Sequence, residues 1–262
     1  MNFLNVSFKV QNVQLSFNVC KRLLAVIGLV IATSVSAQNL PELKVGIDPA
    51  FEPYGIKLPD GSLSGFDVDY ANAICVEIKR KCVFVEQAWG GIIPALSAKK
   101  FDVIISSMAI TEARKKVVLF TDKYSAAINR MVAKKGSAID ASAASLAGKK
   151  IGVAKGSTQE TFAKKVYEKS GATVVSYANA AESYLDLAAG RVDAVIASAL
   201  NVKKGLLDKP EGKDFGYVGP TLNDPEIFGV GAGIALRMED TQLRDQLNAA
   251  IKATRQNGAY KK

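Results

Sequence analysis

Arg114 is the residue of this sequence that points most directly to a bound molecule. It comes after the apolar segment 101–105 and after Thr111, which would cap a short helix over the letters ARKKVVLF. In the first turn of that helix a positive charge opposes the helix dipole, which favours anions at this end. Because an arginine can form two parallel hydrogen bonds with a carboxylate, we expect its partner to be the carboxylate of a ligand.

A second element that could bind an anion is the turn Gly156-Ser157-Thr158-Gln159-Glu160, which follows the apolar letters KIGVAK. Ser157 and Glu160 have the spacing of a capping box, and the first turn of a helix has free backbone N–H groups. Helix capping alone also explains this spacing. Together with Arg114, however, the turn could hold one carboxylate from two sides.

A cation site is indicated by Asp48, Phe51 and Tyr54 in the letters GIDPAFEPYG, and by Trp89 in EQAWGG. A carboxylate beside aromatic faces suits a cationic group through ion pairing and cation–π contact. Two simpler interpretations remain open, since Trp89 could fill the core and Asp48 could form a turn before Pro49.

Catalytic, metal-binding and nucleic-acid-binding classes are disfavoured. The sequence has no histidine and no nucleophile-elbow, Walker or dinucleotide motif, and Ser106 and Ser107 have no base to activate them. Without histidine and with few cysteines, neither a metal site nor a cofactor is expected. The net charge of +9 is scattered over predicted helix faces, so a solvated basic surface is a better interpretation than a nucleic-acid interface.

Short apolar segments alternate with helical patterns along the chain, which predicts an α/β fold with mainly parallel sheets. The predicted strands are 43–47, 82–86, 101–105, 150–154, 173–177 and 192–197. The predicted helices are 66–79, 92–98, 158–169, 180–189 and 240–256.

One segment of the chain is repeated. ALSAKKFDVIISS and DLAAGRVDAVIAS align without gaps, which pairs Asp102 with Asp193 and Ser107 with Ser198. Each copy leads from a helix into a strand that ends at a serine. Because ligands of open α/β sheets bind at the carboxyl ends of the strands, the repeat predicts two similar lobes whose sites face each other across a cleft.

The N-terminus has the pattern of an export signal. Lys21 and Arg22 precede the letters LLAVIGLVIATSV, and Val35-Ser36-Ala37 resembles a cleavage site, so residues 1–37 are predicted to be a signal peptide. The apolar segment is too short for a comfortable membrane span. Of the cysteines, Cys75 and Cys82 would remain; in an exported protein they favour a local disulfide, with two buried thiols as the alternative.

These motifs resemble a known family, the periplasmic polar amino-acid-binding proteins of ABC importers, in particular the lysine/arginine/ornithine- and histidine-binding type. The resemblance runs from about residue 43 to 262 and is carried by the letters GIDPAF, GFDVDYANAIC, IIPALSAKKFDVIISSMAIT, FTDKY, GKKIGVAKGSTQETF, AGRVDAVIA, KPEGKDF and FGVGAGIAL.

The resemblance implies a two-lobed fold that closes over its ligand by a hinge motion. Lobe 1 would comprise residues 38–126 and 229–262, and lobe 2 residues 127–228, with crossing strands near 127–132 and 228–236. It also implies that the cysteine pair forms the disulfide of lobe 1. Relatives of this type continue for about a dozen residues beyond the letters GAYKK, which suggests that this chain is truncated.

The resemblance also assigns roles within the site. Arg114 would hold the α-carboxylate of the ligand, helped by the backbone at Ala109 and Ser157, and the Ser107 carbonyl would accept from the α-amino group. Phe51 would stack on the ligand side chain and Asp48 would meet its cationic end. The complete predicted ligand-binding set is Asp48, Phe51, Trp89, Ser106, Ser107, Ala109, Arg114, Ala154, Ser157, Thr158, Gln159 and Ser198.

Three positions depart from the pattern of this family. Ala109 stands where a Ser or Thr is usual, Ser198 replaces the Asp that pairs with the ligand ammonium, and Gly90 replaces an Asp. Losing the charged partner of a buried ammonium should cost about 3–5 kcal/mol. The serine and the letters EQAW also resemble the opine-binding branch of the family.

The predicted function is therefore capture of a cationic amino acid (arginine, lysine, ornithine or histidine) in the periplasm by a monomer that delivers it to an ABC permease. An opine-binding protein is the alternative, and a dehydratase on the same fold, with Asp48 as its acid or base, is a further hypothesis.

Overall fold

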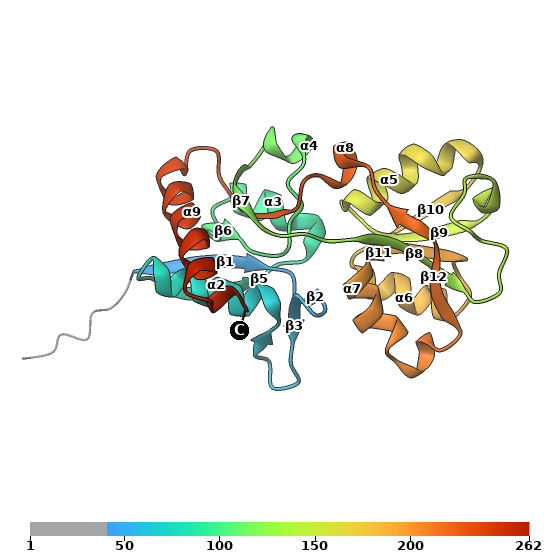
Figure 1. The fold of residues 1–262 in the computed structure, drawn as a ribbon, viewed down its shortest axis with the longest axis horizontal. Helices are drawn as coiled ribbons and strands as arrows, with labels where there is room; N and C mark the ends of the chain where they lie inside the picture. The colour runs from blue at the N-terminus through green and yellow to red at the C-terminus, as the bar shows by residue number, and fades with distance from the viewer. Residues whose placement is uncertain (1–40, 262) are drawn as a thin grey trace, which may run out of the picture. The chain divides into compact units, whose positions relative to one another are not determined.

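Two five-stranded sheets organise residues 41–261, which are those that the computed structural model describes (Figure 1). The predicted signal peptide, residues 1–37, lies outside the described residues. The first sheet has the order β5 (Lys81–Glu86), β1 (Glu42–Ile47), β6 (Val103–Ile104), β13 (Ala232–Leu236) and β7 (Leu119–Ser125). The second has the order β10 (Thr173–Tyr177), β9 (Lys150–Ala154), β11 (Ala194–Ser198), β8 (Asn129–Lys134) and β12 (Phe215–Leu222).

Both sheets are mixed, with three adjacent parallel strands and two antiparallel pairings in each, and helices flank them, which confirms the predicted α/β class. In the first sheet β1 pairs in parallel with β5 and β6, while β13 runs antiparallel to β6 and β7. In the second, β9 pairs in parallel with β10 and β11, while β8 runs antiparallel to β11 and β12. A small antiparallel sheet follows β1 and comprises β2 (Ala50–Phe51), β3 (Gly55–Lys57) and β4 (Leu63–Ser64).

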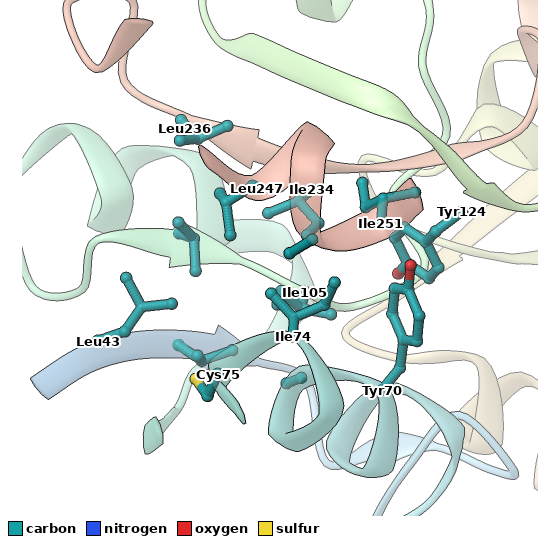
Figure 2. Packing of buried hydrophobic residues seen from close by; sticks show 14 of the residues in the cluster. Leu43, Tyr70, Ile74, Cys75, Ile105, Tyr124, Ile234, Leu236, Leu247 and Ile251 are labelled. Atoms are coloured by element: carbon teal, nitrogen blue, oxygen red, sulfur yellow. The ribbon is translucent and has the colours of Figure 1, made fainter. Parts of the chain in front are cut away.

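Helices cover both faces of the first sheet. On one face, α2 (Phe66–Glu77) and α9 (Thr241–Gln256) pack their apolar sides over the strands, and Figure 2 shows Ile74 and Leu247 in this layer. On the other face lies α3 (Ile92–Ser97). Successive residues of β6 divide between the two faces, with Val103 in one cluster and Ile104 in the other, as the alternation of side chains along a strand requires.

The second sheet is covered in the same way. Helix α5 (Thr158–Val166) packs on one face, and α6 (Ala180–Ala188) and α7 (Ala199–Val202) on the other. Along β11, Ile196 faces α5 and Val195 faces α6, so each sheet forms the centre of a three-layered unit. Cores of this kind bury the apolar faces of helices and sheets against each other.

The chain passes between the two sheets twice. Residues 126–128 lead from β7 to β8, and residues 223–231, which contain α8 (Pro225–Phe228), lead from β12 to β13. Six short helical segments complete the described elements: Trp89–Gly91, Ala144–Leu146, Glu168–Ser170, Lys203–Leu207, Pro210–Gly212 and Ala259–Lys261. Within residues 41–261 no helix has the length and apolarity needed to cross a membrane.

The predicted elements agree with the structure apart from some boundaries. The helix expected over ARKKVVLF is wrong in length, because α4 comprises Glu112–Lys115 and the chain is extended again from Leu119. The β-branched pair Val117-Val118 disfavours further helix at this point. The strand predicted at 101–105 is limited to Val103–Ile104. The disulfide between Cys75 and Cys82 is present and ties α2 to β5.

Candidate functional site

A cavity of about 620 Å³ lies at the carboxyl ends of strands from both sheets. This volume is within the range that is usual for small-molecule sites. All twelve residues of the predicted ligand-binding set line it: Asp48, Phe51, Trp89, Ser106, Ser107, Ala109, Arg114, Ala154, Ser157, Thr158, Gln159 and Ser198. The folded chain therefore brings together residues that lie up to 150 positions apart in the sequence.

Arg114 stands in the cavity wall with its charge unpaired. Its guanidinium donates to the Ala109 carbonyl at 3.0 Å and to the Gly156 carbonyl at 3.2 Å, and it lies 5.1 Å from the centre of the Trp89 ring. Among the described residues no carboxylate lies within ion-pair distance of it. Burial lowers the pKa of Arg114 to about 10, so the group stays charged at neutral pH.

The helix dipole does not explain this arginine. Since α4 has only four residues, Arg114 belongs to its first turn and its last turn at once, and the predicted repulsion between dipole and charge has no basis. Thr111 caps the turn as predicted, by accepting a hydrogen bond from the Arg114 N–H at 3.2 Å. The expectation of a carboxylate partner now depends on the unpaired guanidinium.

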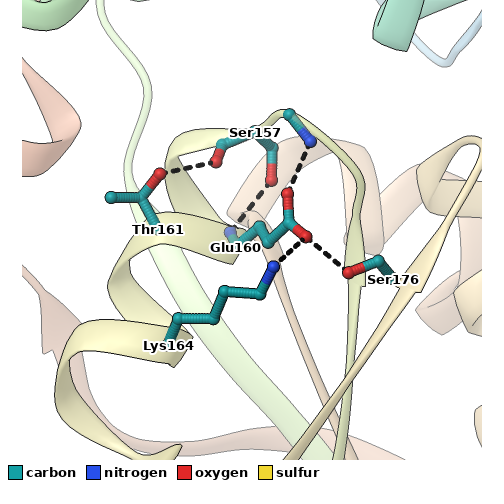
Figure 3. A network of polar contacts seen from close by, with 6 residues as sticks. Ser157, Glu160, Thr161, Lys164 and Ser176 are labelled. Atoms are coloured by element: carbon teal, nitrogen blue, oxygen red, sulfur yellow. Dashed lines mark hydrogen bonds and ion pairs between the residues drawn. The ribbon is translucent and has the colours of Figure 1, made fainter.

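Ser157 caps α5 as predicted, and the Glu160 carboxylate completes a capping-box-like arrangement by binding Gly156, one residue before the cap (Figure 3). Ser157 Oγ accepts from the Glu160 N–H at 3.0 Å, and Glu160 accepts from the Gly156 N–H at 2.6 Å. Lys164 and Ser176 bind the same carboxylate. The capping box thus takes two N–H groups that could have served an anion. Its Gly156 carbonyl accepts from Arg114, so the two predicted anion-seeking elements do lie side by side.

Asp48, which follows β1, is a buried carboxylate at the cavity wall, with 5% of its surface exposed. It accepts a hydrogen bond from the Ala50 N–H at 3.0 Å, and its own N–H donates to Ser106 Oγ at 3.1 Å. Burial raises the pKa of Asp48, and hydrogen bonds from the backbone of Ala50 and Trp89 offset part of that rise. The carboxylate is therefore desolvated, and it shares the cavity wall with the aromatic residues Phe51 and Trp89, which suits a cation site.

Ser107, which follows β6, is held from behind by a buried polar network. Its Oγ donates to Asp67 at 3.1 Å and its N–H donates to the Tyr124 hydroxyl at 2.9 Å, while that hydroxyl donates to the same Asp67 oxygen at 2.8 Å. The backbone of Ser107 is left-handed, with φ of 47°, a conformation uncommon outside glycine. Desolvation raises the pKa of Asp67 to about 7, and the two hydroxyls offset part of the effect.

Ser198 ends β11 and, unlike Ser107, makes no side-chain hydrogen bond of standard geometry, although it is only 3% exposed. Burial raises the pKa of the Tyr54 phenol, and the Ser198 hydroxyl is close enough to offset part of that rise. Tyr54 stacks on Phe51 with ring centres 5.0 Å apart. A buried polar atom without a well-formed hydrogen bond is uncommon in folded proteins, so this hydroxyl is a candidate partner for a polar group of a ligand.

Among the cavity residues absent from the predicted set are Tyr54, Asn129 and Asn201. Tyr54 had a signal in the aromatic cluster around Asp48. Asn129 accepts from the Gln159 side-chain amide at 2.7 Å, and Asn201 donates to the Glu52 carbonyl. No local pattern marks either asparagine, because each acquires its role from a residue far away in the sequence.

Comparison with known proteins places this architecture among the solute-binding proteins. The sequence profile described as "Bacterial extracellular solute-binding proteins, family 3" matches residues 43–262. The L-arginine-binding protein of Pseudomonas aeruginosa is 44% identical, over 90% of this chain and 93% of its own. The histidine-binding periplasmic protein of Salmonella typhimurium is 42% identical, over 88% and 89%. The structure of an ancestral arginine-binding protein bound to arginine is 36% identical, with a TM-score of 0.78 over 86% of this chain and 96% of that one.

Proposed function

Because the chain belongs to family 3 of the bacterial extracellular solute-binding proteins, we propose that it captures a cationic amino acid for an ABC importer and releases it unchanged. The observation that carries this proposal is Arg114, charged and without a carboxylate partner in residues 41–261, in the same cavity as the buried Asp48. The names of the relatives, which bind arginine or histidine, support a cationic ligand.

In the proposed complex, Arg114 binds the ligand carboxylate through its guanidinium fork. Asp48 pairs with the cationic group at the other end of the ligand, and Phe51 and Trp89 provide aromatic faces along the chain between them. Because the pKa of Asp48 is raised, protonation should remove this pairing at a higher pH than for an ordinary aspartate. Affinity should therefore fall as the pH falls through that raised value.

We propose no catalytic step. A dehydratase needs a positioned general acid or base, and of the described side chains that line the cavity only Asp48 could serve at neutral pH. In this proposal Asp48 instead pairs with the cationic group of the ligand. Incubation with prephenate, followed by chromatography of the products, should show no turnover; a new product would contradict the assignment.

Ligand exchange in this proposal involves opening and closing of two lobes, residues 38–126 with 229–262 against residues 127–228. Contacts between them already flank the cavity: Arg114 donates to Gly156, and Asn201 donates to Glu52. Lys209 and Glu52 add an ion pair of 3.3 Å between the same two parts of the chain. Export through cleavage of residues 1–37, a periplasmic location, a monomeric state and delivery to a membrane permease belong to the same proposal.

Isothermal titration calorimetry tests the ligand assignment. The purified protein is first unfolded in guanidinium and refolded, which removes any ligand carried through purification, and is then titrated with arginine, lysine, ornithine, histidine and octopine. We expect saturable binding of at least one of the four cationic amino acids. Binding of none of them would contradict the proposal, and binding of octopine alone would replace it with the opine alternative.

The variant D48N tests the role of the carboxylate. We expect it to lose arginine affinity by about 100-fold, because a buried cation would be left without its partner. D60N is the matched control, since Asp60 is exposed and does not line the cavity. Equal affinities of D48N and D60N would exclude Asp48 from the site.

A further inference from the structure

The charges of the cavity do not match those of a free cationic amino acid. Of the described side chains that line it, only Asp48 and Arg114 are charged at neutral pH. Free arginine or lysine brings one carboxylate and two cationic groups, the α-ammonium and the side-chain cation. One carboxylate in the wall can pair with only one of these two, so the other must be bound by neutral groups.

The arrangement of the wall shows which neutral groups are available. The backbone of Trp89 donates to Asp48, whereas Ser107 is bound to Asp67 and the Ser198 hydroxyl lies close to that of Tyr54. We call Ser107, Ser198 and the Tyr54 hydroxyl the serine end of the cavity. It contains hydroxyls and backbone groups and no ionised side chain.

The two serines differ in what they can offer a ligand. Ser107 Oγ is already bound to Asp67, which is fully buried behind it and does not line the cavity. Ser198 Oγ is 3% exposed at the residue level and has no hydrogen-bond partner of standard geometry. A lone hydroxyl can accept from an amide N–H or an amine as readily as from an ammonium, and it does not compensate the desolvation of a full charge.

We infer that this site does not require the α-ammonium of its ligand. Its ligand class is a carboxylic acid with a distal cationic group, whether the α-nitrogen is charged, substituted or absent. The inference rests on the proposed function, in which Arg114 binds the carboxylate and Asp48 the distal cation, and it extends that function to compounds beyond the free amino acids.

The decisive measurement compares L-arginine with 5-guanidinopentanoate, which is arginine without its α-amino group. Calorimetry on the purified, ligand-stripped protein should give dissociation constants that differ by less than about tenfold. A loss of about tenfold or more on removal of the ammonium would overturn the inference. If arginine binds in that case, the proposed function stands; if neither compound nor any other cationic amino acid binds, the proposed function itself fails.

A pair of variants locates the effect at the serine end. S198D adds a carboxylate there, and we expect it to increase the preference for arginine over 5-guanidinopentanoate by about tenfold or more. S198N, which has the same size without the charge, should alter the affinity for both compounds by a similar factor. An unchanged preference in a folded S198D protein would show that Ser198 does not face the ligand nitrogen and would overturn the inference; the wild-type comparison decides the question if S198D does not fold.

Discussion

The two sheets are built alike, yet they contribute different chemistry to the cavity. The segments that follow strands of the first sheet supply both charged groups, Asp48 and Arg114. The strand ends of the second sheet and the segments that follow them supply neutral ones, among them Ser157, Gln159 and Ser198. The comparison shows that repeated positions within strands maintain the fold, while the residues just beyond the strands decide what is bound.

The two copies of the repeated segment have the same hydrogen bonds at their aspartates and different ones at their serines. Asp102 accepts from the Lys44 N–H at 2.9 Å and Asp193 accepts from the Lys150 N–H at 2.8 Å, so each carboxylate satisfies the first residues of the neighbouring strand. Five positions later the two copies differ. The backbone of Ser107 has a left-handed conformation and its hydroxyl is bound to Asp67, whereas the Ser198 hydroxyl makes no hydrogen bond of standard geometry.

The largest difference in arginine affinity should appear between a variant of a charged cavity residue and a variant of a neutral one. R114A should weaken arginine binding by about 100-fold or more, because the ligand carboxylate would lose a charged partner in a buried site. S157A, on the opposite wall, should weaken it by less than about tenfold and lower the melting temperature through loss of a helix cap. Calorimetry gives both affinities, and thermal unfolding without ligand shows whether R114A is folded. Similar losses in the two variants would contradict the division between a charged and a neutral wall.

The next effect concerns the buried carboxylate behind Ser107. The pKa of Asp67 is raised from 3.8 to about 7 in the folded state, so the folded protein binds a proton that the unfolded chain releases between these values. The contribution of Asp67 to stability is thus greatest below about pH 4 and is lost as the pH rises to about 7. D67N is neutral at every pH, so its stability relative to wild type should increase by about 2–3 kcal/mol between pH 5 and pH 8.

Urea unfolding at the two pH values measures this difference. D69N is the matched control, because Asp69 is in the same helical turn and exposed. It should show no such change relative to wild type. A D67N difference that is the same at both pH values would contradict a folded-state pKa of Asp67 near 7.

A comparable effect on stability should come from the disulfide, which belongs to the first sheet. The double variant C75A/C82A opens a loop of sequence separation 7, and the loss of this constraint on the unfolded chain should cost about 2–3 kcal/mol. Neither cysteine lines the cavity, so the arginine affinity should not change. Calorimetry and urea unfolding on the same sample distinguish the two quantities, and a parallel loss of affinity would show that the first sheet transmits strain to the site.

The smallest effect on stability should come from the aspartate that is repeated in both sheets, Asp102 in the first and Asp193 in the second. D102A and D193A each remove one acceptor from a backbone N–H group, which should cost about 1 kcal/mol. Their ion pairs are long, at 3.7 Å to Arg237 and 3.8 Å to Lys149, and the carboxylates are partly exposed, so these pairs add little. Urea unfolding should therefore give nearly equal losses. Clearly unequal losses of stability would mean that the two copies are alike in sequence but that their aspartates do not have the same structural role.

Much of the fold could be predicted because its signals are local. The strands Lys150–Ala154 and Thr173–Tyr177 have the predicted bounds, since each is a short apolar segment between polar turns. The helix after Thr111 was predicted too long, because a cap shows where a helix begins and not where packing ends it. The twelve predicted cavity residues owe their selection mostly to resemblance, and their binding roles stay a prediction.

What the sequence by itself determined is the periodicity of apolar residues, the caps at Thr111 and Ser157, the repeated aspartates and the family. These features depend on residues a few positions apart or on patterns that relatives share. Only the tertiary structure decided that Arg114 has no carboxylate partner within the described chain, that Asp67 binds Ser107, and that the Ser198 hydroxyl is buried without a hydrogen bond of standard geometry. Each of these is set by contacts between distant segments, and the energy of a buried charge or hydroxyl depends on which atoms surround it in space.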